Sequence, residues 1–222
     1  MIVDKNVVEY INSLEGELPK HLVQLEEKAL NENVPIIKKE TGVLIRFLLT
    51  LLKPSRILEI GTAIGFSTIY ISEYMPEDST ITTIEKVEMR LKEARHNLSH
   101  CSKSDKITLL EGDALLILEE LAKKVEQKGN DNQYDFIFLD AAKGQYINFL
   151  PNILKLLSKN GILITDNVLQ DGEIAGSRYA IRRRDRTIHS RMREYLYTLT
   201  HTNELETVII PIGDGVTLST KK

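Results

Sequence analysis

Three oxygen-bearing side chains follow two apolar segments that have the composition of buried strands. Asp140 ends the run from Tyr134, and Asp166 and Asn167 end the run from Gly161. Ligands of open α/β sheets bind beyond the carboxyl ends of the strands, so we expect these side chains to meet there. Two carboxylates and one amide oxygen suit a hard cation such as Mg²⁺. The alternative is that Asp166 and Asn167 only cap a turn and Asp140 the following helix, but for the trio together a metal is favoured.

A second candidate site begins at a glycine turn. Arg56–Ile60 is a short apolar run, Gly61 and Gly65 follow it, and a segment with helical spacing starts at Phe66. A strand, a glycine turn and a helix form the usual site for a nucleotide-like ligand in an open α/β sheet. Such a turn is weak evidence alone, because many strand-to-helix turns need glycine for steric reasons.

The next apolar run strengthens this prediction. It ends in Glu85, where a carboxylate is well placed to accept hydrogen bonds from both hydroxyls of a ribose. Six polar residues are thereby expected along one rim of the sheet, and repulsion among the carboxylates would be relieved by a cation and a hydroxyl-bearing ligand. They are Glu59, Glu85, Asp113, Asp140, Asp166 and Asn167.

The elements that must position these residues alternate between strand and helix patterns. From position 55 onward this alternation predicts an α/β fold with a mostly parallel sheet. A Gly213–Gly215 turn between two apolar runs predicts a terminal hairpin and hence an antiparallel strand. Polar residues 123–133 are expected to form a loop, and residues 181–200 a basic helix. Three helices are expected before the first strand, at 3–14, 17–31 and 41–52.

Composition sets limits on the whole chain. The 222 residues suit one domain, 1–222, made of N-terminal helices (1–52) and a catalytic core (55–222). Lys and Arg number 29 against 32 Asp and Glu, so the net charge of −3 gives no general attraction to DNA or to a membrane. A single cysteine suits a reducing compartment, and neither a signal peptide nor a membrane-spanning run is evident, so a cytoplasmic location is expected.

Four motifs together resemble a known family. They are Glu59–Ser67, Gly112–Ala114, Asp140–Lys143 and Thr165–Val168. Their order and spacing resemble the class I methyltransferases of the catechol and caffeoyl-CoA type. Those enzymes use S-adenosylmethionine (SAM) and Mg²⁺ to methylate one of two neighbouring oxygens. The resemblance implies a Rossmann-like methyltransferase fold, with a mostly parallel seven-stranded sheet and an antiparallel C-terminal strand, and a homodimer in which the N-terminal helices are a candidate interface.

A narrower resemblance is to the bacterial tRNA 5-hydroxyuridine methyltransferases, which make 5-methoxyuridine at the wobble position. It is carried by Asp140–Tyr146, the arginine run Arg182–Arg184, and Ile209–Gly215. The resemblance implies a tRNA anticodon loop as the partner. In 5-hydroxyuridine the ring O4 and the 5-hydroxyl are neighbours, so the base offers the same pair of oxygens as a catechol.

The resemblance also implies roles for individual residues. Glu85 would bind the ribose hydroxyls, and Asp113 and Ala114 the adenine. The methionine half of SAM would be lined by Ile37, Gly61 and Ser67, with Asp140 near the cofactor. Asp140, Asp166 and Asn167 would hold Mg²⁺.

Lys143 is the candidate general base. It lies three residues after Asp140, so its side chain is within reach of a metal-bound oxygen. A lysine beside a divalent cation is expected to give up its proton more easily, as a general base at neutral pH must. The alternative is a solvated surface lysine, but the motif position favours catalysis.

The basic segment bears on the substrate. Seven arginines lie between positions 178 and 193 against the single acid Asp185, a local charge of +6. Such a surface attracts phosphates, and Arg182, Arg183, Arg184 and Arg186 are the candidate RNA contacts. On one continuous helix, Arg182, Arg186 and Arg193 would lie near one face. A helix that pairs with the acidic rim or with a partner subunit remains the alternative.

Three other functions share some of these features. A small-molecule O-methyltransferase acting on catechols or hydroxycinnamoyl-CoA would have the same cofactor and metal residues, and its CoA would also favour arginines. An NAD-dependent dehydrogenase is disfavoured because the turn lacks the Gly-x-Gly-x-x-Gly spacing. A non-enzymatic RNA-binding module would have no use for Lys143.

Overall fold

The computed structural model describes residues 2–222, apart from the side chain of Lys128, and is built on one seven-stranded sheet. The strand order is β3-β2-β1-β4-β5-β7-β6, and β7 alone runs in the direction opposite to that of the other six strands. The predicted fold class is therefore confirmed, including the terminal hairpin. The strands are β1 (Arg56–Ile60), β2 (Thr80–Glu85), β3 (Ile107–Glu111), β4 (Tyr134–Leu139), β5 (Leu157–Thr165), β6 (Leu205–Ile210) and β7 (Val216–Lys221).

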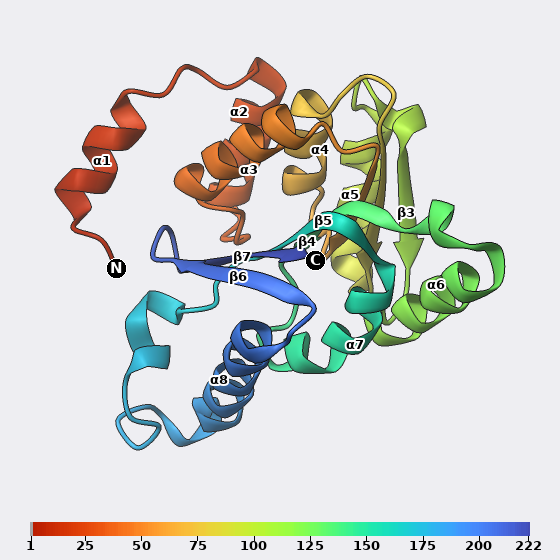
Figure 1. Cartoon of the computed structure of the whole chain (residues 1–222). Coiled ribbons are helices and arrows are strands. Elements are labelled where there is room, and N and C mark those ends of the chain that lie inside the picture. The colour runs from red at the N-terminus through yellow and green to blue at the C-terminus, as the bar shows by residue number, and fades with distance from the viewer. Residues whose placement is uncertain (1) are drawn as a thin grey trace.

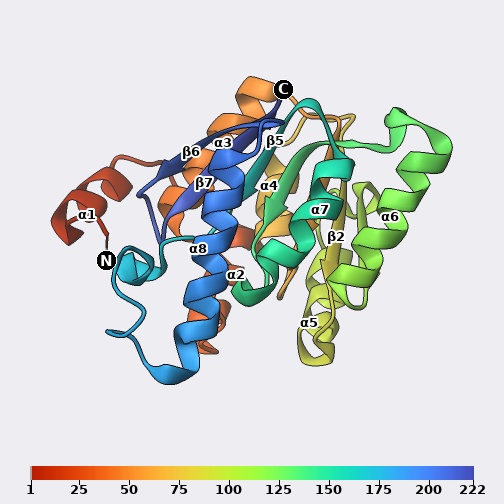
Figure 2. The same cartoon turned by 60° about the horizontal axis from the view of Figure 1, so that its bottom comes forward.

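Helices cover both faces of this sheet (Figures 1 and 2). Alternation of side chains along the strands explains the two layers, since Ile57 and Phe136 join one core cluster whereas Leu58 and Ile137 join the other. The first cluster is covered by α2 (Lys20–Asn31), α3 (Lys39–Leu52), α4 (Phe66–Tyr74) and α5 (Glu88–Ser99), and the second by α6 (Ala114–Lys128), α7 (Tyr146–Leu156) and α8 (Arg186–His201).

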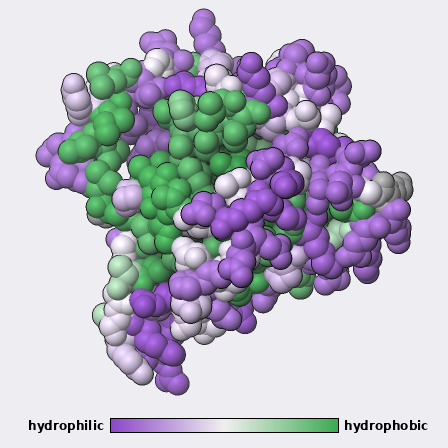
Figure 3. Space-filling view, in the orientation of Figure 1, coloured by the Kyte–Doolittle hydropathy of each residue, from purple (hydrophilic) through white to green (hydrophobic). Residues whose placement is uncertain are grey.

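The first helix, α1 (Lys5–Ser13), stands apart from both layers. Asp4 caps it by accepting a hydrogen bond from the Asn6 N–H at 2.9 Å, but none of its residues is buried. Figure 3 shows hydrophobic side chains gathered over α1 and α3 on one face of the molecule. Those exposed on these helices are Val7, Tyr10, Ile11, Phe47, Leu51 and Leu52.

Two predicted element boundaries are wrong. Residues 123–128 continue α6 instead of forming a loop, because Ala122 and Val125 bury an apolar stripe against the core that outweighs the surrounding polar residues. The basic helix begins at Arg186 and not at 181, so Arg182–Arg184 precede it. Arg182 therefore does not share a helix face with Arg186. None of the helices within residues 2–222 combines the length and the apolar character that crossing a bilayer requires.

Candidate active site

The predicted cofactor residues line two adjoining cavities beyond the carboxyl ends of the parallel strands. One cavity, of about 360 Å³, is lined by Glu85, Asp113 and Ala114. The other, of about 420 Å³, is lined by Ile37 and Ser67, together with Lys143 and Asn167. Gly61, Ala63, Asp140, Ala141 and Pro35 line both. An elongated ligand with a nucleoside at one end and an amino acid at the other would occupy both.

Gly61 lines both cavities at the turn after β1. Its φ of +108° lies in the left-handed region, and a β-carbon there would lie 2.0 Å from the Asp140 carbonyl oxygen. Any other residue would push the turn after β1 away from the end of β4. The glycine is thus required both by its backbone angle and by the close approach of two strand ends.

Glu85 is held in place by the backbone around it. Its Oε2 accepts a hydrogen bond from the Ala63 N–H at 2.9 Å, and its Oε1 accepts from the N–H groups of Lys86 and Val87, both at 2.9 Å. The carboxylate oxygens keep acceptor capacity beyond these three bonds, so they can also accept from the hydroxyls of a ligand. These bonds fix the carboxylate at the wall of the first cavity.

Asp113 begins α6, where its Oδ1 accepts a hydrogen bond from the Leu115 N–H at 2.9 Å. That hydrogen bond is the main reason why the pKa of Asp113 is lowered, and the nearby Lys86 ammonium adds to the effect. The carboxylate is exposed and lines the cavity next to Ala114. It serves as a helix cap, and its predicted contact with adenine stays a prediction.

Glu59 does not lie on the rim, and this prediction is wrong. Its side chain is fully buried beneath the glycine turn, where Oε2 accepts hydrogen bonds from the hydroxyls of Thr68 and Thr83. Residue 59 is inside β1 and shares the strand face of Ile57, which points into the core. Burial raises the pKa of the Glu59 carboxyl, although the hydroxyl donors act in the opposite direction.

Asp140, which is half-buried, and Asp166, which is buried, are two interacting carboxyl groups at the ends of β4 and β5. Burial is the main reason why the pKa of Asp140 is raised to about 6 and that of Asp166 to about 7. Asp140 adds to the rise at Asp166, Glu59 adds to the rise at Asp140, and Lys143 acts against both. Asp166 is 2% exposed, and its Oδ1 accepts a hydrogen bond from the Asn167 N–H at 2.8 Å. A carboxyl pair of this kind favours a bound cation or a shared proton.

The donor set suits a hard divalent cation. Two carboxylates and the amide of Asn167 offer only oxygen ligands, which Mg²⁺ prefers. Across residues 2–222, no three His, Cys, Asp or Glu side chains come together in a way that could hold a metal. A metal here would therefore need the Asn167 amide oxygen as its third protein ligand.

Lys143 lies in a short 3₁₀ turn, η3 (Lys143–Gln145), that follows β4. The turn is braced by α8, since Arg191 Nη1 donates to the Gly144 carbonyl oxygen at 3.0 Å. Lys143 lines the second cavity, and its charge acts on both Asp140 and Asp166. The structure thus brings Lys143 and the three predicted metal ligands to one corner of the site.

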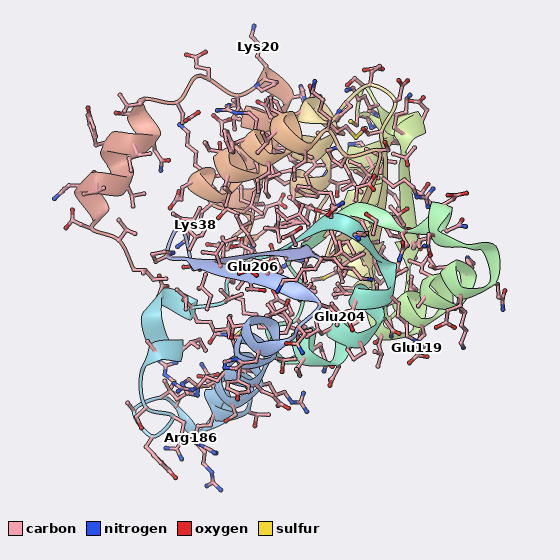
Figure 4. The ribbon with its side chains drawn as sticks, in the orientation of Figure 1. Lys20, Lys38, Glu119, Arg186, Glu204 and Glu206 are labelled. Atoms are coloured by element: carbon pink, nitrogen blue, oxygen red, sulfur yellow. The ribbon has the colours of Figure 1, made fainter. Side chains whose placement is uncertain are left out.

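Two residues of this corner were not found from the sequence. Asp214, in the turn between β6 and β7, accepts hydrogen bonds from Lys38 Nζ at 2.6 Å and from Asn167 Nδ2 at 3.1 Å. Both Lys38 and Asp214 line the second cavity, and Lys38 is labelled in Figure 4. The sequence marked Asp214 only as part of the hairpin turn and of the Ile209–Gly215 motif, without a role at the site, and nothing marked Lys38.

The predicted RNA contacts lie on an exposed segment beside the site. Arg182, Arg183 and Arg184 are exposed, and Arg186 is half-buried at the start of α8, where Figure 4 labels it. The guanidinium groups of Arg178 and Arg186 lie 5.8 and 5.6 Å from the ring centroid of Tyr179. Tyr179 is 76% exposed and was not predicted to contribute.

The fold and the paired cavities suit a nucleoside-containing cofactor, and the comparisons with known proteins identify the class as that of the SAM-dependent O-methyltransferases. The chain belongs to the O-methyltransferase family, whose model matches residues 11–222. It is 29% identical over 203 residues to caffeoyl-CoA O-methyltransferase 5 of Nicotiana tabacum. The aligned region covers 90% of this chain and 83% of that protein.

Solved structures of similar fold include other methyltransferases. A Staphylococcus aureus protein described as a caffeoyl-CoA O-methyltransferase is 31% identical, with a TM-score of 0.83 and 98% of each chain covered. An SAH-bound methyltransferase of Podospora anserina is 26% identical, with a TM-score of 0.84, over 98% of this chain and 94% of that one.

Proposed function

We propose that this enzyme methylates the 5-hydroxyl group of 5-hydroxyuridine at the wobble position of tRNA, giving 5-methoxyuridine, with SAM as donor and Mg²⁺ as the metal. The observation that carries the choice of RNA is the exposed basic segment beside the cavities, in which two guanidinium groups flank the exposed ring of Tyr179. Aromatic rings and guanidinium planes are the groups on which proteins stack unpaired bases.

The cofactor part of the proposal assigns the first cavity to adenosine and the second to methionine. Glu85 would accept hydrogen bonds from the ribose hydroxyls, with Asp113 and Ala114 at the adenine. Ile37, Gly61 and Ser67 would line the methionine half, with Asp140 beside it. The two cavities share Gly61 and Asp140, which supports one ligand that extends through both.

The catalytic part assigns roles to four residues. Asp140, Asp166 and Asn167 would hold Mg²⁺, which when bound would supply positive charge that orients the substrate and makes its hydroxyl more acidic. SAM supplies an electrophilic methyl group on its sulfonium. Lys143 Nζ would accept the hydroxyl proton. Because Arg191 braces the turn that carries it, Lys143 stays beside the carboxylate pair.

The RNA part rests on charge and exposure. Arg182, Arg183 and Arg184 are exposed, and among the ion pairs described in residues 2–222 only Arg184 takes part in one, a 3.6 Å contact with Asp185. Their guanidinium groups are accessible to phosphates. Anticodon loops expose unstacked bases, so a uridine could enter the site while the arginines hold the flanking backbone.

A small-molecule substrate is the second candidate. Relatives named for caffeoyl-CoA favour a hydroxycinnamoyl-CoA or a catechol, and CoA phosphates would also attract arginines. Both candidates use the same metal and cofactor residues. Measured turnover of each substrate is therefore needed to distinguish the two candidates.

The homodimer belongs to the same proposal. The exposed hydrophobic side chains of α1 and α3 form one face (Figure 3), and Val208 and Ile209 on β6 are also exposed. Packing against a second copy would remove this surface from water. Light scattering that gives the mass of one chain would contradict the dimer without affecting the catalytic proposal.

Mass spectrometry of tRNA nucleosides tests the substrate. Cells that lack the gene should lose 5-methoxyuridine and accumulate 5-hydroxyuridine, and a copy carrying Lys143→Met should fail to restore it. Purified enzyme should methylate tRNA that contains 5-hydroxyuridine. An unchanged nucleoside profile, together with turnover of caffeoyl-CoA, would transfer the assignment to the small-molecule candidate.

A further inference from the structure

Three segments that are distant in the sequence meet at one carboxylate beside the proposed metal site. Lys38 lies in the connector before α3, Asn167 follows β5, and Asp214 lies in the turn between β6 and β7. Lys38 Nζ donates to Asp214 Oδ1 at 2.6 Å, and Asn167 Nδ2 donates to Asp214 Oδ2 at 3.1 Å. Each oxygen of the Asp214 carboxylate therefore has its own donor.

The turn that carries Asp214 has little freedom to move. Gly213 and Gly215 have φ values of +56° and +86°, and a β-carbon on Gly215 would lie 2.4 Å from Leu169 Cγ. The Asp214 carbonyl oxygen accepts hydrogen bonds from the Leu169 N–H at 2.9 Å and the Gln170 N–H at 3.1 Å. The turn is thus fastened to the same segment that carries Asn167, which fixes the two side chains relative to each other.

This contact determines the orientation of the Asn167 amide. A carboxylate only accepts hydrogen bonds, so the amide must turn its nitrogen toward Asp214 and its oxygen away. We propose that Asp214 is a positioning residue, which presents the Asn167 Oδ1 atom as the third metal ligand, and that Lys38 holds Asp214 back from the metal. The inference rests on the metal in the proposed function.

The arrangement makes an unusual prediction for Asn167→Asp. In most oxygen-lined sites an added carboxylate would strengthen the binding of a divalent cation. Here the new carboxylate would face that of Asp214 at the distance of a hydrogen bond, with no donor between them. We therefore expect N167D to weaken metal binding.

The reversed pair should restore binding. In N167D/D214N the amide lies at position 214 and donates to the carboxylate at 167, whose other oxygen remains for the metal. The single variant D214N leaves two amides that can pair in either orientation, so the Asn167 oxygen is no longer held toward the metal. Loss of a group that orients a metal ligand typically costs 10- to 100-fold in affinity.

Titration with Mn²⁺, followed by electron paramagnetic resonance of the free ion, measures this directly and needs no substrate. We expect D214N to weaken Mn²⁺ binding about 10-fold and N167D by at least as much, with the double variant within about 3-fold of the wild type. Asp78→Asn, an exposed carboxylate in the turn before β2, is the matched control and should change nothing. SAM affinity and the melting temperature report whether each variant folds.

The outcomes separate this inference from the function on which it rests. Wild-type protein that fails to bind Mn²⁺ would overturn both. If the wild type binds Mn²⁺, three results would each overturn the role of Asp214 alone. They are an unchanged Mn²⁺ affinity in D214N, a higher Mn²⁺ affinity in N167D, and a Mn²⁺ affinity of the double variant no higher than that of N167D. Should D214N fail to fold, the comparison of N167D with the double variant still decides.

Discussion

The cofactor side of the site and the basic segment next to it are built in opposite ways. On the cofactor side, each functional carboxylate is fixed by the ends of strands, as Glu85 is by three backbone N–H groups. On the basic segment, Arg182–Arg184 are exposed and lie outside any long helix. The first region requires a defined geometry, whereas the second supplies charge over a broad surface.

The two regions meet different requirements, since one serves methyl transfer and the other serves binding of the substrate. Methyl transfer depends on atoms held within a fraction of an ångström, so its residues lie where the sheet positions them. Attraction of a polyanion depends on charge and tolerates movement. Substitutions in the first region should therefore affect turnover with any substrate, and those in the second only with a phosphate-rich one.

Loss of the buried carboxylate at Asp166 should produce the largest effect. Asp166→Ala removes one of the proposed metal ligands, and we expect kcat to fall about 10³-fold, since roughly 4 kcal/mol of transition-state stabilisation would be lost. Chelation of the wild type with EDTA should have a similar effect that added Mg²⁺ reverses. Calorimetric titration with SAM serves as the control for folding. Full turnover of the wild type in EDTA would exclude a metal.

Lys143→Met should have the next largest effect. Removal of a general base typically costs 10²- to 10⁴-fold in kcat, and we expect about 10³ with little change in KM or SAM affinity. Lys143→Arg keeps the positive charge but cannot accept a proton, so it should be nearly as inactive. An arginine variant with wild-type kcat would show that position 143 contributes only charge.

The basic segment should respond more weakly and in a different manner. Replacing Arg182, Arg183 and Arg184 together by Ala should lower kcat/KM for tRNA about 30-fold at moderate salt. The slope of log affinity against log salt should become shallower by about 2, because each phosphate contact on a single strand contributes roughly 0.7.

The control for this change is a pair of exposed lysines on α6, Lys123 and Lys124, replaced by Ala. That variant should leave tRNA methylation unchanged. If the arginine variant lost turnover with a small catechol to the same extent as with tRNA, the distinction between the two regions would not hold.

The positions of Glu85 and Asp140 at the rim could be predicted because strand ends carry a local signal. A carboxylate that closes an apolar run, as Glu85 and Asp140 do, is placed at the rim by the strand itself. Glu59 shows the limit of that rule, since it lies one residue before the end of β1, a strand covered on both faces, and its side chain therefore points into the core.

Contacts between distant segments could not be predicted in this way. The pairing of Lys38 with Asp214 joins residues 176 positions apart, and no local pattern encodes it. Likewise, the end of α6 is decided by the burial of Val125 against the core rather than by the polar residues around it. Tertiary packing, and not local propensity, determined both.

The smallest expected effect concerns Glu59, which lies beneath the cofactor turn but takes no part in the chemistry. Its folded pKa is raised, so the neutral form is favoured, and its contribution to stability is complete below the unfolded value near 4.5 and is lost as the pH rises through the folded pKa. Glu59→Gln stays neutral at every pH while its amide oxygen still accepts from Thr68 and Thr83. The variant should therefore become more stable relative to the wild type as the pH rises above 4.5. Urea unfolding at a series of pH values measures the difference, with Glu77→Gln, an exposed carboxyl in the turn before β2, as the control. If the difference in unfolding free energy between Glu59→Gln and the wild type stayed constant with pH, Glu59 would be equally ionised in the folded and unfolded chains.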